Sequence, residues 1–228
     1  MKTLFTYNEI CLDALREVGN IGLGNAMTAL STMIDQGVDM SVPRVGVVPL
    51  SQFAEMAGGE ESVAACIYMP VEGEVSGHVA FLLPELSAYI LADHLLGLPS
   101  GTTTELDDIA CSALMEVGNI LTGSYLVAIS DMTGLSLLAS PPALAIDMTA
   151  AILASIASTF AADADMAMTI LTRIGQAGNG IEGFFIFVPE PESLMTLFTA
   201  LGMEKEACKL LSPRHTSANT AEVVECAA

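Results

Sequence analysis

Apolar residues recur at helical spacing in two long stretches of the chain. The first covers about residues 7–34 and the second about residues 106–132, and each predicts a long amphipathic helix. Shorter segments with alternating polarity and many β-branched residues predict strands at 44–50, 62–69, 74–83, 143–147, 166–174 and 181–188. Shorter helices are expected at 85–96, 148–161 and 190–201. This mixture predicts an α/β (α+β) fold.

Apart from the helix expected at 148–161, which only the second copy carries, the predicted elements come in the same order twice, and the sequence repeats with them. Residues 13–43 and 112–142, placed without gaps at an offset of 99, share 13 of 31 positions, including the run EVGNI. Two copies are too few for a solenoid. We therefore expect one pseudo-two-fold, duplicated domain over 1–203, with an antiparallel sheet packed against the two long helices. Its repeats span about 7–98 and 106–203, and the polar segment 204–228 is expected to be a flexible tail.

A polar stripe runs along each predicted long helix. At about 100° per residue, Glu17, Asn20 and Gly24 fall on one side of the first helix, and Leu15 and Val18 on the other. The second helix repeats the stripe with Glu116, Asn119 and Gly123. Side chains three residues apart project side by side, and a helical Gly costs about 1 kcal/mol relative to Ala. The stripe predicts a site that another molecule approaches closely; the alternative is an exposed face whose glycines serve helix–helix contact.

The charge balance bears on possible partners. The chain carries 27 acidic and seven basic residues, for a formal charge of −20. This charge repels the phosphate backbone of nucleic acids, so no nucleic-acid partner is expected. A partner with a basic patch and a salty cytoplasm would both account for the acidity, and the composition does not separate them.

The high hydrophobic content, 52% of residues, raises the question of a membrane. The longest stretch with almost no charge, 132–162, contains Asp147 and the pair Pro141-Pro142. It therefore lacks the roughly 18–20 continuous apolar residues of a membrane span. The N-terminal residues lack the apolar core of a signal peptide. We expect a soluble, cytoplasmic protein with no membrane partner.

Cysteine and histidine spacing gives no support for a metal site or a cofactor. The five cysteines form no CxxC pair and the three histidines show neither HxxxH nor HExxH spacing. Neither GxGxxG nor a Walker loop is present. We expect reduced thiols and no metal or cofactor of the protein's own.

The two stripes belong to a longer pattern that carries a family resemblance. Asp13, Glu17, Asn20 and Pro43 follow the spacing Asp/Ser-x3-Glu-x2-Asn-x22-Pro, and Ser112, Glu116, Asn119 and Pro142 follow it again. In this pattern the chain resembles the CheC/CheX/FliY phosphatases. Two intact copies on one chain resemble the CheC-like members, and the duplicated layout covers about residues 7–203.

The resemblance implies an activity and a role for each of these residues. The family hydrolyses the aspartyl phosphate of CheY-type response regulators in chemotaxis. Asn20 and Asn119 would orient the attacking water, and Glu17 and Glu116 would pair with the receiver's active-site lysine. The Mg²⁺ would be the receiver's own.

The remaining residues of the pattern are expected to support the site. Asp13 and Ser112 are inside their helices, where they would support the glutamates or contact the receiver. Pro43 and Pro142 are expected to fix the start of the first strand of each copy. Gly19 and Gly118 lie inside the two EVGNI runs, at about −120° around the helix from Asp13 and Ser112 and away from the stripe. Both glycines are expected to serve close helix–helix packing.

Two other functions remain open from the sequence. A non-enzymatic binding module like the related middle domain of FliM would share the fold but lack the Glu/Asn pairs. An adapter for CheD, the receptor deamidase that partners CheC proteins, would receive CheD at the helical segment 148–161. The alternative for that segment is that it merely caps the sheet.

Overall fold

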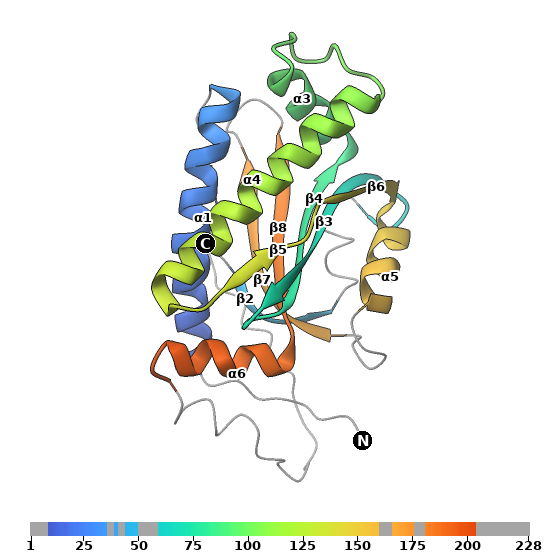
Figure 1. Cartoon of the computed structure of the whole chain (residues 1–228). Coiled ribbons are helices and arrows are strands. Elements are labelled where there is room, and N and C mark those ends of the chain that lie inside the picture. The colour runs from blue at the N-terminus through green and yellow to red at the C-terminus, as the bar shows by residue number, and fades with distance from the viewer. Residues whose placement is uncertain are drawn as a thin grey trace.

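Two long helices lie across one face of a central antiparallel sheet in the computed structural model (Figure 1). They are α1 (Glu9–Ile34) and α4 (Asp108–Thr133), and they run in opposite directions. The structure describes residues 9–35, 39–40, 44–49, 59–159, 166–175 and 181–203. The predicted tail, 204–228, is outside these residues.

The sheet combines strands from both copies of the repeat. The strands of the first copy are β1 (Asp39–Met40), β2 (Arg44–Pro49), β3 (Val63–Gly73) and β4 (Gly77–Pro84). Those of the second copy are β5 (Leu137–Ala139), β6 (Ala143–Met148), β7 (Met166–Gly175) and β8 (Glu182–Pro189). The order is β1-β7-β8-β4-β3-β5, with β2 also paired to β7 and β6 also paired to β3.

The edge strands are exchanged between the copies. β1 and β2 of the first copy pair with β7 of the second, whereas β5 and β6 of the second copy pair with β3 of the first. The central contact between β4 and β8 joins the two hairpins. The sheet therefore repeats about a pseudo-two-fold axis between β4 and β8, and each copy completes the edge of the other.

A break in pairing divides each edge strand in two. On β3, Val71 pairs with Ala139 and Tyr68 with Ala143, so a step of three residues opposes a step of four. Pro142 lies in the break and directly precedes β6. Proline has no N–H to donate, and strand prolines are confined to edges and bulges. Pro43, at the corresponding position of the first copy, is outside the described residues.

The main core lies between the long helices and the sheet. Alternate residues of β3, β4 and β8 face the helices, among them Ile67, Phe81 and Phe185. The largest fully buried side chain is Tyr125 of α4, whose ring packs against Phe185 and Phe187 at centroid distances of 5.1 and 5.5 Å. By length and composition α4 could cross a membrane, but half of that apolar stretch is buried inside the protein.

A second, smaller core lies on the opposite face of the sheet, under α5 (Thr149–Thr159). Ile152 and Leu153 of α5 are buried among Cys66, Leu82 and Ile186. The sequence predicted this helix at 148–161. Its expected absence from the first copy falls on residues outside the described part of the chain.

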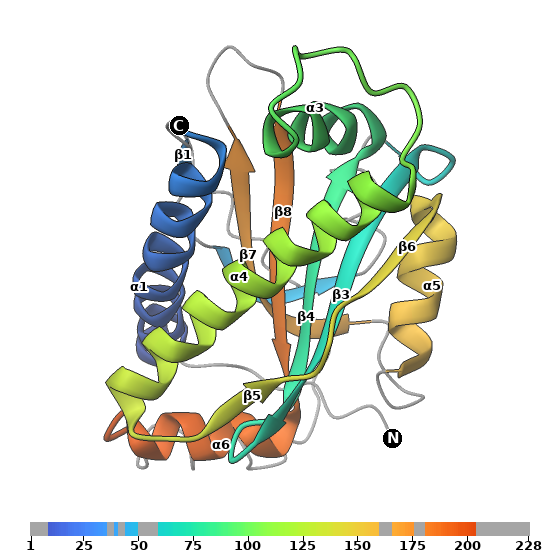
Figure 2. The same ribbon diagram turned by 45° about the horizontal axis from the view of Figure 1, so that its top comes forward.

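Two short helices close the ends of the sheet, α3 (Glu85–Leu95) at one end and α6 (Pro191–Ala200) at the other (Figure 2). Asp93 of α3 is buried and holds the segment that joins the two copies. Its carboxylate accepts hydrogen bonds from the backbone N–H groups of Gly101, Thr102 and Thr103 at 2.7–3.0 Å, and from the Thr103 hydroxyl at 2.6 Å. The start of α4 is thereby tied to α3.

Candidate functional site

The stripe of α1 lies on the solvent side of the helix. Glu17 is exposed and Asn20 is half-buried, whereas Leu15 and Val18 are fully buried against the sheet. The buried arc is wider than the sequence predicted, because Leu23 and Met27 are buried as well. The Glu/Asn pair therefore sits at the border between the exposed surface and the packed face of α1.

The stripe of α4 has the same arrangement. Glu116 and Asn119 are both exposed, and the two residues between them, Val117 and Gly118, are buried. A Cβ on Gly118 would lie only 3.1 Å from the Cβ of Ile67 on β3 and would overlap its Cγ2. The expectation that Gly118 serves helix–helix packing is wrong, because its close neighbour is the sheet. Within the EVGNI run, two buried packing residues thus lie between the outward-facing Glu and Asn.

Small residues leave open space beside each pair. A Cβ placed on Gly24 or Gly123 would meet no atom within 4 Å. Tertiary packing therefore does not require glycine at either position, although glycine lowers helix stability. This supports the prediction that the stripes are kept narrow for an approaching molecule, rather than for contact between helices.

The glycine that does serve helix–helix contact is Gly22. A Cβ there would lie 2.8 Å from Cε2 of Tyr125, so the backbone of α1 packs directly against the tyrosine ring of α4 at this glycine. Glu17 and Asn20 precede this contact along α1, and Glu116 and Asn119 precede it along α4. Because the helices are antiparallel (Figures 1 and 2), the two pairs lie on opposite sides of the crossing. They form two separate sites.

The supporting residues make contacts that the sequence did not predict. Asp13 is exposed and forms an ion pair with Arg16, one turn along α1, and not a contact to Glu17. The Ser112 hydroxyl donates to the carbonyl oxygen of Asp108 at 2.7 Å. Both residues lie inside their helices, as predicted. The N-cap of α4 is Asp107, whose carboxylate accepts from the Ala110 N–H at 2.8 Å.

The four Glu and Asn side chains of the stripes are uncommitted. No hydrogen bond or ion pair to any described residue engages Glu17, Asn20, Glu116 or Asn119. An amide both donates and accepts hydrogen bonds, and a carboxylate accepts them or pairs with a cation. The described residues also contain no group of three His, Cys, Asp or Glu that would hold a metal ion. The chemistry that these pairs offer is hydrogen bonding and charge pairing with a second molecule.

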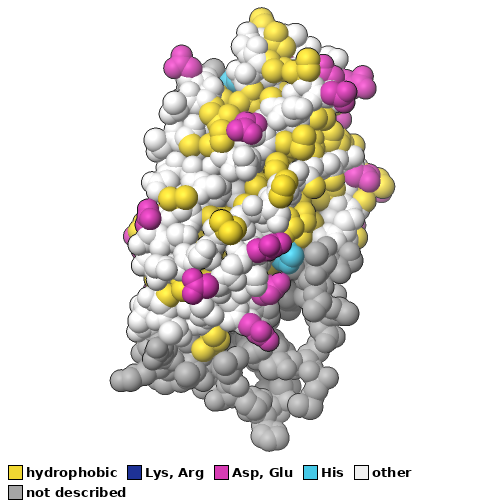
Figure 3. Space-filling model, viewed as in Figure 1, with side chains coloured by type: hydrophobic (Ala, Val, Ile, Leu, Met, Phe, Trp, Pro, Cys, Tyr) yellow, Lys and Arg dark blue, Asp and Glu magenta, His cyan; other side chains and the backbone are white. Residues whose placement is uncertain are grey.

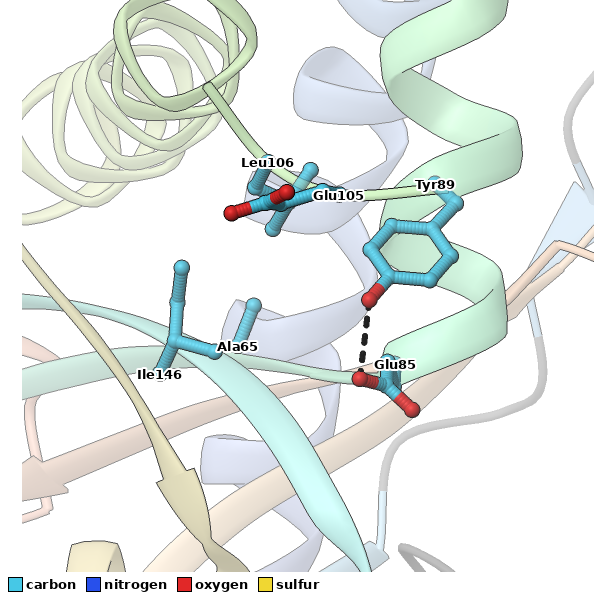
Figure 4. Close-up of a pocket in the computed structure, with 6 residues that line it drawn as sticks. All are labelled: Ala65, Glu85, Tyr89, Glu105, Leu106 and Ile146. Carbon is cyan, nitrogen blue, oxygen red and sulfur yellow. Dashed lines mark hydrogen bonds between the residues drawn. The ribbon is translucent and has the colours of Figure 1, made fainter. Parts of the chain in front are cut away.

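The surface around the helices is acidic and partly apolar. Figure 3 shows acidic side chains scattered over the helix-covered face, with a band of apolar side chains beside the start of α4. Ile109, at the start of α4, is 64% exposed, and Ile146 of β6 is 45% exposed. An open cavity of about 220 Å³ lies there too, lined by Ala65, Glu85, Tyr89, Glu105, Leu106 and Ile146 (Figure 4). The Tyr89 hydroxyl donates to Glu85 at 2.8 Å. None of the Glu/Asn residues lines this cavity.

Comparison with known proteins identifies the family. A profile of the CheC-like family matches residues 10–47 and 109–146, two segments separated by the same 99 residues as the repeat. The protein named CheY-P phosphatase CheC from Bacillus subtilis (strain 168) is 32% identical over 195 residues, which cover 84% of this chain and 93% of that protein. The chain belongs to the CheC-like family. Both profile segments of this CheC-like chain contain a Glu/Asn pair.

Solved structures share the fold. Thermotoga maritima FliY superposes with a TM-score of 0.69 at 19% identity, over 87% of this chain and 99% of that chain. CheX in a CheX–CheY–BeF3–Mg²⁺ complex from Borrelia burgdorferi superposes with a TM-score of 0.50 at 14% identity, over 74% of this chain and 96% of that chain. The mixed fold predicted from the sequence, an antiparallel sheet packed against two long helices, is confirmed.

One residue beside the first pair was not among the predicted site residues. Arg16 precedes Asn20 by one helical turn, and its side chain is 39% exposed. Its equivalent in the second copy is Met115. The signal was available in the repeat, because a basic residue is rare in this chain and the two copies differ at this position.

Proposed function

We propose that this CheC-like chain is a hydrolase that removes the phosphoryl group from the aspartate of a CheY-type response regulator in chemotaxis. The observation that carries the proposal is the pair of Glu/Asn sites in a chain 32% identical to the B. subtilis CheY-P phosphatase CheC. Three of the four side chains are exposed and Asn20 is half-buried, and no described residue engages any of them. The structure of a related CheX in complex with CheY supports a receiver as the partner. A FliM-like binding module would not need these four side chains.

The proposed chemistry needs little from the enzyme beyond position. An aspartyl phosphate is an acyl phosphate and already labile, so placing a water in line with phosphorus accounts for much of the rate gain. Asn20 and Asn119 suit this role, because a carboxamide accepts a hydrogen bond from the water while it donates to a neighbouring oxygen. No nucleophile on this chain is required.

The glutamates would fix the register of the receiver. Glu17 and Glu116 are exposed one turn before their asparagines, where a carboxylate can form a charge-assisted bond with the receiver's active-site lysine. The Mg²⁺ would be carried by the receiver, and this chain would need no cofactor of its own. A receiver is a cytoplasmic protein, so this function places the chain in the cytoplasm, with no membrane or nucleic-acid partner.

The test is a double substitution of the asparagines. Asn20→Ala with Asn119→Ala should lower the acceleration of receiver dephosphorylation by at least about 100-fold, the effect of misplacing a reacting group. Each single variant should keep part of the rate if both sites act. The decay of a phosphorylated CheY-type receiver is followed with and without each variant.

Asn25→Ala is the matched control, because Asn25 is an exposed asparagine on α1 outside the stripe. It should keep the full rate. A double variant that retains most of the acceleration, while circular dichroism shows an intact fold, would contradict the assignment of the sites.

An adapter role with CheD is a second candidate, and it would use a different surface. On α5, Ile152 and Leu153 cap the sheet, while Ala150 and Ala154 are exposed. The helix thus caps the sheet and still presents an outer side, which supports docking of CheD there. In a pull-down with the cognate CheD, Ala154→Arg should weaken capture and leave dephosphorylation unchanged. If the wild-type chain and the Ala154→Arg variant capture equal amounts of CheD, this surface is ruled out.

A further inference from the structure

The two Glu/Asn sites differ in the side chains around them. At an offset of 99, Arg16 of the first site corresponds to Met115, and Thr28 corresponds to Val127. Thr28 is exposed and Val127 is 57% exposed. The first site is thus bordered by a charged and a polar residue, and the second by two apolar ones.

Arg16 lies within reach of whatever docks on the first pair. It is one turn before Asn20, so the two side chains project from neighbouring positions on α1. Its Nη1 bonds to Asp13, which holds the side chain along the helix. A guanidinium has five N–H donors, and no described residue engages the others. Arg16 therefore presents an anchored cation with donors to spare.

At the second site, the position equivalent to Arg16 holds no cation. Met115 is half-buried, and Ser112, the counterpart of Asp13, spends its hydroxyl on the Asp108 carbonyl of its own helix. Val127 lies about two turns beyond Asn119 and within about 20° of Glu116 around the axis of α4. An incoming surface meets apolar side chains there.

We propose that Arg16 makes the first site selective for a receiver surface that carries a carboxylate, whereas Met115 and Val127 make the second site selective for an apolar one. This inference rests on the proposed function and assigns a specificity to each site. The two copies then serve different receivers, or different faces of one receiver, with the same Glu/Asn chemistry.

The experiment isolates each site before testing it. Glu116→Ala with Asn119→Ala leaves only the first site intact, and this variant is called the first-site chain. Glu17→Ala with Asn20→Ala leaves only the second site intact and gives the second-site chain. Hydrolysis of phosphorylated CheY is measured with each chain at several NaCl concentrations. If a single-site variant shows no measurable hydrolysis, its affinity for BeF3-activated CheY is measured in place of KM.

The first-site chain should lose kcat/KM more steeply with salt, because screening weakens an exposed ion pair. Arg16→Met in that chain should raise KM about two- to five-fold at low salt, as expected for one exposed charge pair, and should flatten the salt dependence with kcat unchanged. Arg16→Lys should restore most of the affinity. Met115→Arg in the second-site chain should create salt dependence, and Met115→Leu should not.

Equal salt dependence of the two isolated sites would overturn the inference, as would a gain in kcat/KM from Arg16→Met. Neither result affects the proposed function, which fails only if the chain with both sites intact does not accelerate dephosphorylation. The helical signal in the far-ultraviolet circular dichroism spectrum of each variant confirms that folded proteins are being compared.

Discussion

The same substitution, Gly to Ala, should have opposite effects at two positions of α4. At Gly123 an added methyl group meets no atom within 4 Å, so only the helix propensity changes. Gly123→Ala should therefore stabilise the fold by about 1 kcal/mol. At Gly118 the methyl group would overlap Ile67, a fully buried and stiff β-branched residue. Overpacking costs about 1–3 kcal/mol and the propensity gain offsets about 1 kcal/mol of it, so Gly118→Ala should destabilise the fold by up to about 2 kcal/mol.

Urea unfolding followed by far-ultraviolet circular dichroism measures both effects. The midpoints should move in opposite directions with unchanged m-values, since neither variant alters the surface exposed on unfolding. Gly123→Ala should nevertheless slow receiver dephosphorylation, because the methyl group fills the open side of the second stripe. If Gly118→Ala is as stable as Gly123→Ala, the close packing of α4 on β3 is refuted as the reason for that glycine.

Two further substitutions and one chemical modification test other parts of the structure. The buried Tyr125 hydroxyl finds no hydrogen-bond partner among the described residues, so Tyr125→Phe should leave stability unchanged or raise it by about 1 kcal/mol in thermal or urea unfolding. At Asp93, burial raises the carboxyl pKa, but hydrogen bonds from residues 101–103 outweigh it, and the pKa falls below its ordinary 3.8. A carboxyl group whose pKa is lower in the folded state stabilises the fold at pH values above its unfolded pKa, and this stabilisation is lost as the pH falls through the folded pKa. Asp93→Asn should therefore lower the free energy of unfolding by about 3 kcal/mol at pH 7. In urea unfolding at several pH values, the difference should shrink progressively below about pH 4. Burial raises the pKa of the Cys66 thiol to about 12, so iodoacetamide at pH 8 should leave Cys66 unmodified in the folded protein and alkylate it after unfolding, as read by mass spectrometry.

Local sequence patterns predicted most elements, because helix and strand periodicity is a local property. α1 and α4 were placed within a few residues of their observed bounds, and each strand of more than three residues was anticipated. The short strands β1 and β5 were missed, since two or three residues carry no period. Edge exchange between the copies was also out of reach, because pairing of β2 with β7 joins residues more than a hundred positions apart.

For the candidate site, helical periodicity predicts the direction in which a side chain projects but not which residues surround it. The angle of about 100° per residue placed Glu17 and Glu116 toward solvent, where the structure has them. It also placed Gly118 away from the stripe, but only the structure shows that the residue beyond it is Ile67 of a strand. Similarly, Asp13 was expected to support Glu17 or to contact the receiver, and among the described residues it pairs with Arg16. Helical spacing favours both contacts equally, and side-chain charge decides between them.

The identity of the EVGNI run in both copies now has a physical explanation at four of its five positions. Glu and Asn face outward at the first and fourth positions, and Val and Gly are buried at the second and third. In the second copy the glycine fixes the distance between α4 and β3, and thereby the height of the Glu/Asn pair above the sheet. A site that acts by positioning a water depends on such rigidity. A change at Gly118 should therefore lower activity at the second site even where Glu116 and Asn119 are intact. The rate of receiver dephosphorylation at the first site, on the other side of the helix crossing, should stay unchanged.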